Sequence, residues 1–289
     1  MNKTEKLIWQ AKMLIKTNWI NAKILLEEGK QDFPEEREIY IMLGDLYAQH
    51  DLHKEAIKNY QKALELEPND DYLRFKFGNS LLVLDEYRLA LDQYNLCEEK
   101  FPELTYNKAY AYYKMGKISI SIQLMEEIVN DPLATEMPLI FMTELHFMKQ
   151  EYEKAISYID KAEKRFGVQG NFLYLKGLAY FHLENYLKAF INFQKAEKLA
   201  FSANHFCLNY GIVAHKIGKD NKAEKMLLKF IEDNPENGQG YAELINFYID
   251  MSEIKKAEKI AKKAKKNSDF SLTLSLAYNK LHLYTNNQF

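Results

Sequence analysis

The side chains in this sequence that could perform chemistry are mainly seven histidines and two cysteines. His182, His205 and His215 lie in neighbouring stretches of the chain, and imidazoles brought together could bind zinc. No H-x-x-x-H spacing or carboxylate to orient a ring accompanies them. Cys97 and Cys207 are far apart and in no C-x-x-C motif, so they support neither a disulfide framework nor a zinc site. The pattern favours separate polar residues over a metal centre.

The common motifs of catalysis and nucleotide binding are missing from the sequence. No G-x-G-x-x-G, G-x-x-x-x-G-K-[ST], H-E-x-x-H, G-x-S-x-G or calcium-loop pattern occurs. The eleven glycines lie mostly at helix-packing or turn positions instead. We therefore predict that the chain is not an enzyme and that it has no catalytic residue, metal or cofactor.

The charge of the chain limits its partners. The 39 Lys and Arg nearly balance the 41 Asp and Glu, so no overall field attracts nucleic acid or an anionic membrane. The strongest local feature is the lysine-rich run Lys255–Lys266, in which apolar residues recur at helical spacing. We interpret this run as the solvated outer face of a helix, with a basic patch for an anionic surface as the alternative.

The chain shows no convincing signal for export or membrane insertion. Lys12 and Lys16 interrupt the apolar N-terminal segment, and no small-residue cleavage site follows it. The longest stretch without a charged residue, Leu199–His215, contains several polar residues and makes a poor membrane span. We therefore predict a cytoplasmic protein with no membrane span.

A repeat of 34 residues sets the positions of the structural elements. Small residues recur with a step of 34 residues, except for one step of 31. This series is Ala22, Ala56, Ala90, Ser121, Ala155, Ala189, Ala223 and Ala257. A second series of mostly small residues, which includes Gly44, Gly78, Gly177 and Gly211, lies twelve residues earlier. Because repeats of this length cannot bury their apolar faces alone, we expect them to stack into an extended array.

The second unit shows how one repeat should fold. Apolar and small residues at helical spacing predict a first helix from Glu38 to His50 and a second from about His53 to Leu66. Small residues in both helices allow a close approach, while aromatic residues such as Tyr60 fill the volume between them. Pro68 cannot continue the second helix, so the chain turns there and the next unit begins.

This pattern resembles the tetratricopeptide repeat family. Arg37–Asp70 matches almost every signature position of the family, and Gly170–Ala203 matches nearly as well. The resemblance implies an all-α fold, a right-handed superhelical α-solenoid of about eight helix-turn-helix units with a C-terminal capping helix and tail at residues 272–289. We expect one array over residues 3–271, with units at about 3–36, 37–70, 71–104, 105–135, 136–169, 170–203, 204–237 and 238–271.

The step of 31 residues predicts an irregular junction between the third and fourth units. Pro102 keeps its usual offset from Ala90, and Gly116 keeps its offset from Ser121. We therefore place the three missing residues between Pro102 and the helix that contains Tyr106.

The resemblance also implies a binding surface, because repeats of this family bind ligands in a groove lined by their first helices. Residues at the groove positions are rich in aromatic side chains in units three to six. The candidate partner-binding residues are Tyr72, Phe75, Asn79, Tyr106, Tyr110, Tyr113, Ile140, Phe147, Tyr174 and Phe181. The alternative is that these aromatic side chains are buried against neighbouring repeats.

We predict a non-catalytic protein–protein interaction scaffold or adaptor that binds an apolar or amphipathic peptide segment in this groove. One alternative is a helical-repeat RNA-binding protein, but such a groove should be basic, and Glu38, Asp45 and Glu103 argue against it. The other alternative is a peptide-sensing regulator, for whose effector domain the repeats leave no room. Self-association is left open.

Overall fold

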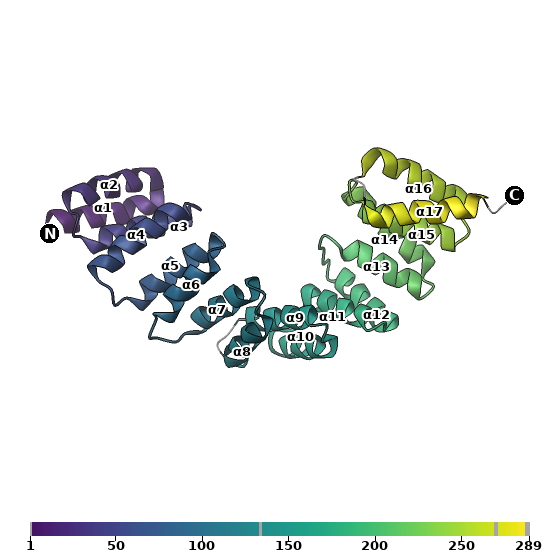
Figure 1. Ribbon diagram of the computed structural model, residues 1–289, viewed down its shortest axis with the longest axis horizontal. Coiled ribbons are helices and arrows are strands. Elements are labelled where there is room, and N and C mark those ends of the chain that lie inside the picture. The colour runs from purple at the N-terminus through teal and green to yellow at the C-terminus, as the bar shows by residue number, and fades with distance from the viewer. Residues whose placement is uncertain (1, 133–134, 269–270, 287–289) are drawn as a thin grey trace. The chain divides into compact units, whose positions relative to one another are not determined.

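The structure of the chain is a computed structural model that describes residues 2–132, 135–268 and 271–286 (Figure 1). Every regular element in these ranges is an α-helix, which confirms the predicted all-α class. The chain divides into two compact units, residues 1–138 and 139–289. We call them the N-terminal half and the C-terminal half and describe each by itself.

The N-terminal half consists of consecutive helix pairs over its described residues. These pairs are α1 Lys3–Thr17 with α2 Trp19–Asp32, α3 Arg37–Gln49 with α4 His53–Leu66, α5 Asp71–Val83 with α6 Tyr87–Asn95, and α7 Pro102–Lys114 with α8 Ile118–Ile128. The second helix of each pair also packs on the first helix of the next pair, as α2 does on α3 and α4 does on α5. This stacking gives the half a continuous core between its pairs.

The C-terminal half continues the same order of elements. Its helices are α9 Met137–Met148, α10 Tyr152–Phe166, α11 Gly170–His182, α12 Tyr186–Lys198, α13 Phe206–Lys216, α14 Asp220–Asp233, α15 Gly238–Asp250, α16 Ile254–Asn267 and α17 Leu272–Asn286. The first two residues of α9, Met137 and Pro138, belong to the N-terminal half. The last helix, α17, packs against α15 and α16 and buries Leu274, Ala277 and Leu281. Its other side is not polar, because Leu276 and Leu283 are largely exposed there.

A recurring turn ends the first helix of successive pairs. The second residue after that helix adopts the left-handed conformation. The backbone N–H of the following residue then donates a hydrogen bond to the carbonyl five residues earlier, as from Leu52 to Tyr47 (2.9 Å) and from Glu253 to Tyr248 (2.8 Å). The left-handed residues are Asp51, Asp85, Gly116, Gln150, Glu184, Gly218 and Ser252. The hydrogen bonds satisfy carbonyls at the helix end, so the turn persists even where the residue is not glycine.

Close contact within the pairs depends on glycine beneath an aromatic ring. A Cβ added at Gly44 would lie 2.4 Å from Tyr60 Cε1, and one added at Gly78 would lie 2.3 Å from Tyr94 Cε1. Such distances are far shorter than van der Waals contact. Glycine therefore allows these helices to approach at the distance that the repeat requires.

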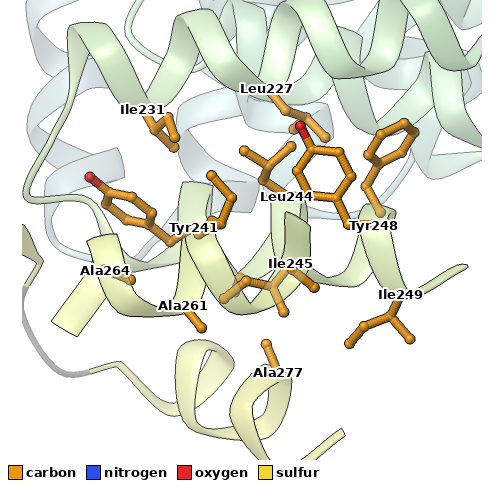
Figure 2. Close-up of a cluster of buried hydrophobic side chains, with 14 of the residues drawn as sticks. Leu227, Ile231, Tyr241, Leu244, Ile245, Tyr248, Ile249, Ala261, Ala264 and Ala277 are labelled. Carbon is orange, nitrogen blue, oxygen red and sulfur yellow. The ribbon is translucent and has the colours of Figure 1, made fainter. Parts of the chain in front are cut away.

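The repeat position of Gly44 and Gly78 holds a large residue near the end of the C-terminal half. There Ile245 takes the place of the small residue, and the residue sixteen positions later is Ala261. Both are buried in one cluster with Leu244, Tyr248 and Ala277, drawn in Figure 2. Ile245 thus stands where units two to seven have a smaller residue.

The junction at the short step is irregular, but the predicted place of the missing residues is wrong. Pro102 does not end the preceding unit; it lies in the first turn of α7, which runs on through Tyr106. The shortened element is α6, with nine residues against fourteen in α4. Proline is favoured in a first turn because its missing N–H would have no helical partner there. The helix α7 thus begins before the expected boundary of unit four at residue 105.

Candidate partner-binding surfaces

The ten predicted partner-binding residues are distributed over both halves. Tyr72, Phe75, Asn79, Tyr106, Tyr110 and Tyr113 belong to the N-terminal half, and Ile140, Phe147, Tyr174 and Phe181 to the C-terminal half. Tyr72 is 63% exposed, and the others are partly buried. Side chains of this kind can pack within the array and still present surface to a partner, so their contacts decide their role.

The aromatic residues of α5 form a small cluster. The ring of Phe75 meets Phe101 edge to face at 5.0 Å between centroids and lies 6.0 Å from the buried ring of Tyr94. Tyr72 lies 6.4 Å from Phe75 on the exposed side. Phe75 therefore joins the packed interior to an exposed aromatic ring.

Asn79 is held by hydrogen bonds within the array. Its side-chain oxygen accepts from the Tyr94 hydroxyl (2.8 Å) and from the Asn107 amide (2.7 Å), which connects α5 to α6 and α7. Asp45 occupies the same place one unit earlier, where it accepts from Tyr60 (2.9 Å) and Lys76 (2.8 Å). Because Asn79 and Asp45 already bind neighbouring helices, their first role is to orient the repeats.

A cavity of about 580 Å³ lies on the N-terminal half beside this cluster. Its lining residues are Phe75 of α5, Pro102, Glu103, Tyr106 and Asn107 of α7, Ile128 of α8, and Asp131, Thr135, Met137 and Pro138. The cavity brings the predicted residues Phe75 and Tyr106 together, while Tyr72, Tyr110 and Tyr113 do not line it. Its size falls within the range of roughly 300 to 1,000 Å³ that is usual for ligand pockets.

The sequence analysis placed Glu103 in the groove but missed several other walls of this cavity. Ile128 lies at the end of a second helix, and Asp131 and Thr135 lie beyond it. These positions do not repeat with the groove positions of the first helices, so periodicity gave no signal for them. Pro102 entered the cavity because α7 starts earlier than expected.

In the C-terminal half, Tyr174 mainly serves the core. Its ring lies 5.3 Å from Phe201 and 5.8 Å from both Phe193 and Phe206, and its hydroxyl accepts from the Asn209 amide (3.0 Å). Burial raises the pKa of its hydroxyl. The alternative of burial against neighbouring repeats therefore describes Tyr174 better than an open groove does.

Phe147 and Phe181 border a smaller aromatic group around His182. The ring of Phe147 lies 6.1 Å from His182 and 5.6 Å from Tyr152, and Phe181 lies 5.6 Å from His182. Ile140 is partly buried in α9. These contacts leave part of each side chain accessible.

The C-terminal half has a more polar cavity of about 360 Å³, formed by α13, α14, α15 and α17. His215 contacts Asp220 (3.2 Å) and Asp250 (3.4 Å), and Lys280 donates to Asp250 at 2.8 Å. Burial raises the pKa of Glu243, which lines the same cavity. The sequence analysis considered His215 only as a possible metal ligand and did not select any of these residues for partner binding, although His215 stands at a groove position of the seventh unit.

The remaining histidines and cysteines considered for chemistry are packed against neighbouring side chains. His182 stacks on Tyr152 at 4.7 Å, and His205 lies 5.9 Å from Phe230. Burial raises the pKa of both cysteine thiols, which disfavours the reactive thiolate. Within the described ranges, no group of three or more His, Cys, Asp or Glu side chains is arranged to hold a metal ion. None of the helices in these ranges is both long and apolar enough to cross a membrane.

The lysine-rich run forms α16. Its apolar residues lie on one buried stripe, as their helical spacing predicted; they are Ala257, Ile260, Ala261 and Ala264. Its lysines lie outside that stripe, and Lys256 contacts Glu224 (3.2 Å) and Glu253 (2.6 Å). The helix is therefore a packed element of the array with a basic outer face.

The helix pairs and their spacing define a helical repeat protein, and two segments identify the repeat. Residues 37–70 and residues 145–203 match the tetratricopeptide repeat family. The chain therefore carries tetratricopeptide repeats, as the sequence pattern predicted. Proteins with this fold typically act as scaffolds for protein–protein interactions and are generally not catalytic.

Two curated relatives are similar over part of the chain. General transcription factor 3C polypeptide 3 of Homo sapiens is 25% identical over 136 residues, which is 44% of this chain and 15% of that protein. An uncharacterized TPR repeat-containing protein of Arabidopsis thaliana is 33% identical over 72 residues, 25% of this chain and 9% of that protein. The chain therefore spans only a small part of the length of these relatives.

Solved structures share the fold at low sequence identity. The C-terminal part of a TPR repeat-containing protein from Cytophaga hutchinsonii has a TM-score of 0.65 at 18% identity and covers 81% of this chain and 97% of its own. A tetratricopeptide repeat protein from Parabacteroides merdae has a TM-score of 0.62 at 15% identity, with coverage of 79% and 92%. YrrB, described as a TPR protein with an unusual peptide-binding site, has a TM-score of 0.50 at 18% identity, with coverage of 60% and 91%.

Proposed function

We propose that this chain is a non-catalytic scaffold that binds an apolar or amphipathic segment of a partner protein at the cavity of its N-terminal half. The main observation is that Phe75 and Tyr106, which come from different repeats, line one cavity of about 580 Å³ together with Ile128 and Met137. Met137 is half exposed, so the apolar lining reaches the surface. Concave apolar sites of this size commonly receive side chains of a peptide.

The composition of the cavity supports a protein partner over RNA. Its walls provide aromatic and aliphatic surface, and its charged lining residues are Glu103 and Asp131. RNA-binding grooves place Lys and Arg where phosphates pass, and carboxylates at these positions would repel them. Aromatic anchors in the centre of protein interfaces, in contrast, contribute much of the binding free energy.

The proposal can be tested with Tyr106→Ala in the full chain and Tyr87→Ala as the matched control, since Tyr87 lies on α6 in the same half and lines no part of the cavity. Partners recovered from a nuclease-treated lysate would be quantified together with the melting temperature of each variant. Loss of a central aromatic side chain should reduce binding by about thirtyfold or more. Tyr87→Ala should retain the same partners.

Two results would contradict the proposal. Equal recovery by wild type and Tyr106→Ala, at unchanged melting temperature, would mean that partners bind elsewhere. Recovery that disappears completely on nuclease treatment would favour the RNA-binding alternative. A large drop in melting temperature would instead assign Tyr106 to the core, and the less buried wall residue Met137 would then be truncated to repeat the test.

A further inference from the structure

The acidic rim of the cavity in the N-terminal half carries information about its occupant. Glu103 is exposed in the first turn of α7, and Asp131, which follows α8, also lines the cavity. No Lys or Arg is among the lining residues. Residues 126–136 contain four acidic residues and no basic one. The apolar floor is therefore bordered by negative charge.

The apolar and the acidic lining residues would contact different groups of one ligand. Phe75, Ile128 and Met137 offer apolar contact, which rewards a large aromatic or aliphatic side chain. Carboxylates at the border attract ammonium or guanidinium groups and repel other carboxylates. An apolar residue with an acidic neighbour would place like charges together, at a cost to binding.

We propose that the cavity receives a basic amphipathic peptide segment, in which a large apolar side chain enters the cavity and a neighbouring Lys or Arg pairs with Glu103. This inference rests on the proposed function, since it specifies the partner class for the same site. It adds a charge requirement that an apolar groove alone would not impose. Acidic amphipathic segments of equal hydrophobicity should bind weakly.

Random short peptides displayed on phage provide a probe that requires no known partner. The full chain is used as bait, and the selected sequences are compared with those selected by Tyr106→Ala. We expect the wild type to enrich peptides with a large apolar residue close to Lys or Arg, and Tyr106→Ala to lose that enrichment. A synthetic copy of the strongest peptide is then titrated against each variant.

Charge reversal at Glu103 tests this pairing. Glu103→Lys should lower the affinity for the synthetic peptide by roughly tenfold. A peptide with Glu in place of its basic residue should bind Glu103→Lys more tightly and so recover part of that loss. Asp92→Lys is the matched control, because Asp92 is exposed on α6 in the same half and does not line the cavity. Its affinity should stay within about twofold of wild type. Circular dichroism confirms the fold of each variant, and Glu103→Gln replaces Glu103→Lys if the latter unfolds.

The outcomes distinguish a failure of the charge requirement from a failure of the proposed scaffold function. Peptides that depend on Tyr106 but show no preference for Lys or Arg would overturn the charge requirement and leave the scaffold function in place. The same holds if Glu103→Lys and Asp92→Lys bind the peptide equally. If selection yields no peptide that depends on Tyr106, both the basic partner and the proposed site are wrong.

Discussion

Two helix contacts at the same place in the repeat are built in opposite ways in the two halves. In the N-terminal half, Gly44 lies under the ring of Tyr60. In the C-terminal half, the first helix provides the large Ile245 and the second helix provides the small Ala261. Both contacts are buried, so the large residue can come from either helix. The repeat therefore constrains the volume that two helices share more strongly than it constrains each residue type.

Intermediate pairs follow the same rule. The positions sixteen residues apart are Gly44 and Tyr60, Gly78 and Tyr94, Ala109 and Met125, Thr143 and Ile159, Gly177 and Phe193, Gly211 and Leu227, and Ile245 and Ala261. All of these residues are buried. The largest second residues, Tyr60, Tyr94 and Phe193, stand opposite glycine, and the smallest, Ala261, stands opposite the largest first residue, Ile245.

The largest expected effect comes from removing the large partner in the N-terminal half. Tyr60→Ala should destabilise the chain by about 3 to 5 kcal/mol, because truncating a buried aromatic side chain leaves a cavity. At the equivalent position Ala261→Gly should cost only about 1 kcal/mol, mainly through lower helix propensity. Urea unfolding followed by circular dichroism measures both changes. Similar losses for the two variants would mean that the positions do not differ as the structure indicates.

Placing the large residue at position 44 and the small one at position 60 tests more sharply whether the two positions share one volume. Gly44→Ile should cost about 1 to 3 kcal/mol, since even a Cβ at Gly44 would meet the Tyr60 ring. Combined with Tyr60→Ala, it reproduces the arrangement of Ile245 and Ala261. The double variant should then be more stable than the sum of the single losses predicts, by roughly 0.5 to 3 kcal/mol. A double variant whose loss is simply additive would contradict the idea that the pair shares one volume.

The smallest effects come from two carboxylates that distinguish the halves. Burial favours the protonated form of Asp70, but the N–H of Leu73 and the nearby Arg37 guanidinium outweigh it and hold the pKa below its usual range. Its contribution is present above about pH 4 and is lost as the pH falls through the lowered pKa. Burial raises the pKa of Glu243, so its ionised form destabilises the fold as the pH rises above about 4.

Asp70→Asn should therefore cost about 0.2 to 1 kcal/mol near neutral pH and little in acid, because Asn keeps the helix cap but loses the charge. Glu243→Gln should have the opposite sign and stabilise the chain near neutral pH, with no difference in acid. Denaturant midpoints across this pH range check both. The same pH dependence for the two variants would refute the assigned pKa directions.

The sequence predicted the helices well because small residues and prolines repeat with the period of the fold. It failed at Pro102, since a proline that ends one unit and a proline that opens the next helix have the same spacing signature. It also gave no signal for the left-handed turns at Asp51 and Gln150, where backbone hydrogen bonds rather than glycine set the conformation. The cavity combined periodic residues such as Phe75 with nonperiodic ones such as Ile128, so only part of it could be predicted.

The sequence by itself determined the class of this protein, because a 34-residue spacing of small residues on apolar helical stripes is typical of stacked helix pairs. Tertiary structure decided the role of each aromatic side chain. Tyr174 and Phe75 share one place in the repeat pattern, yet Tyr174 packs among Phe193, Phe201 and Phe206 while Phe75 lines a cavity. The physical reason is that helical spacing fixes the direction of a side chain, whereas the neighbouring helices and linkers determine whether the space in front of it is filled.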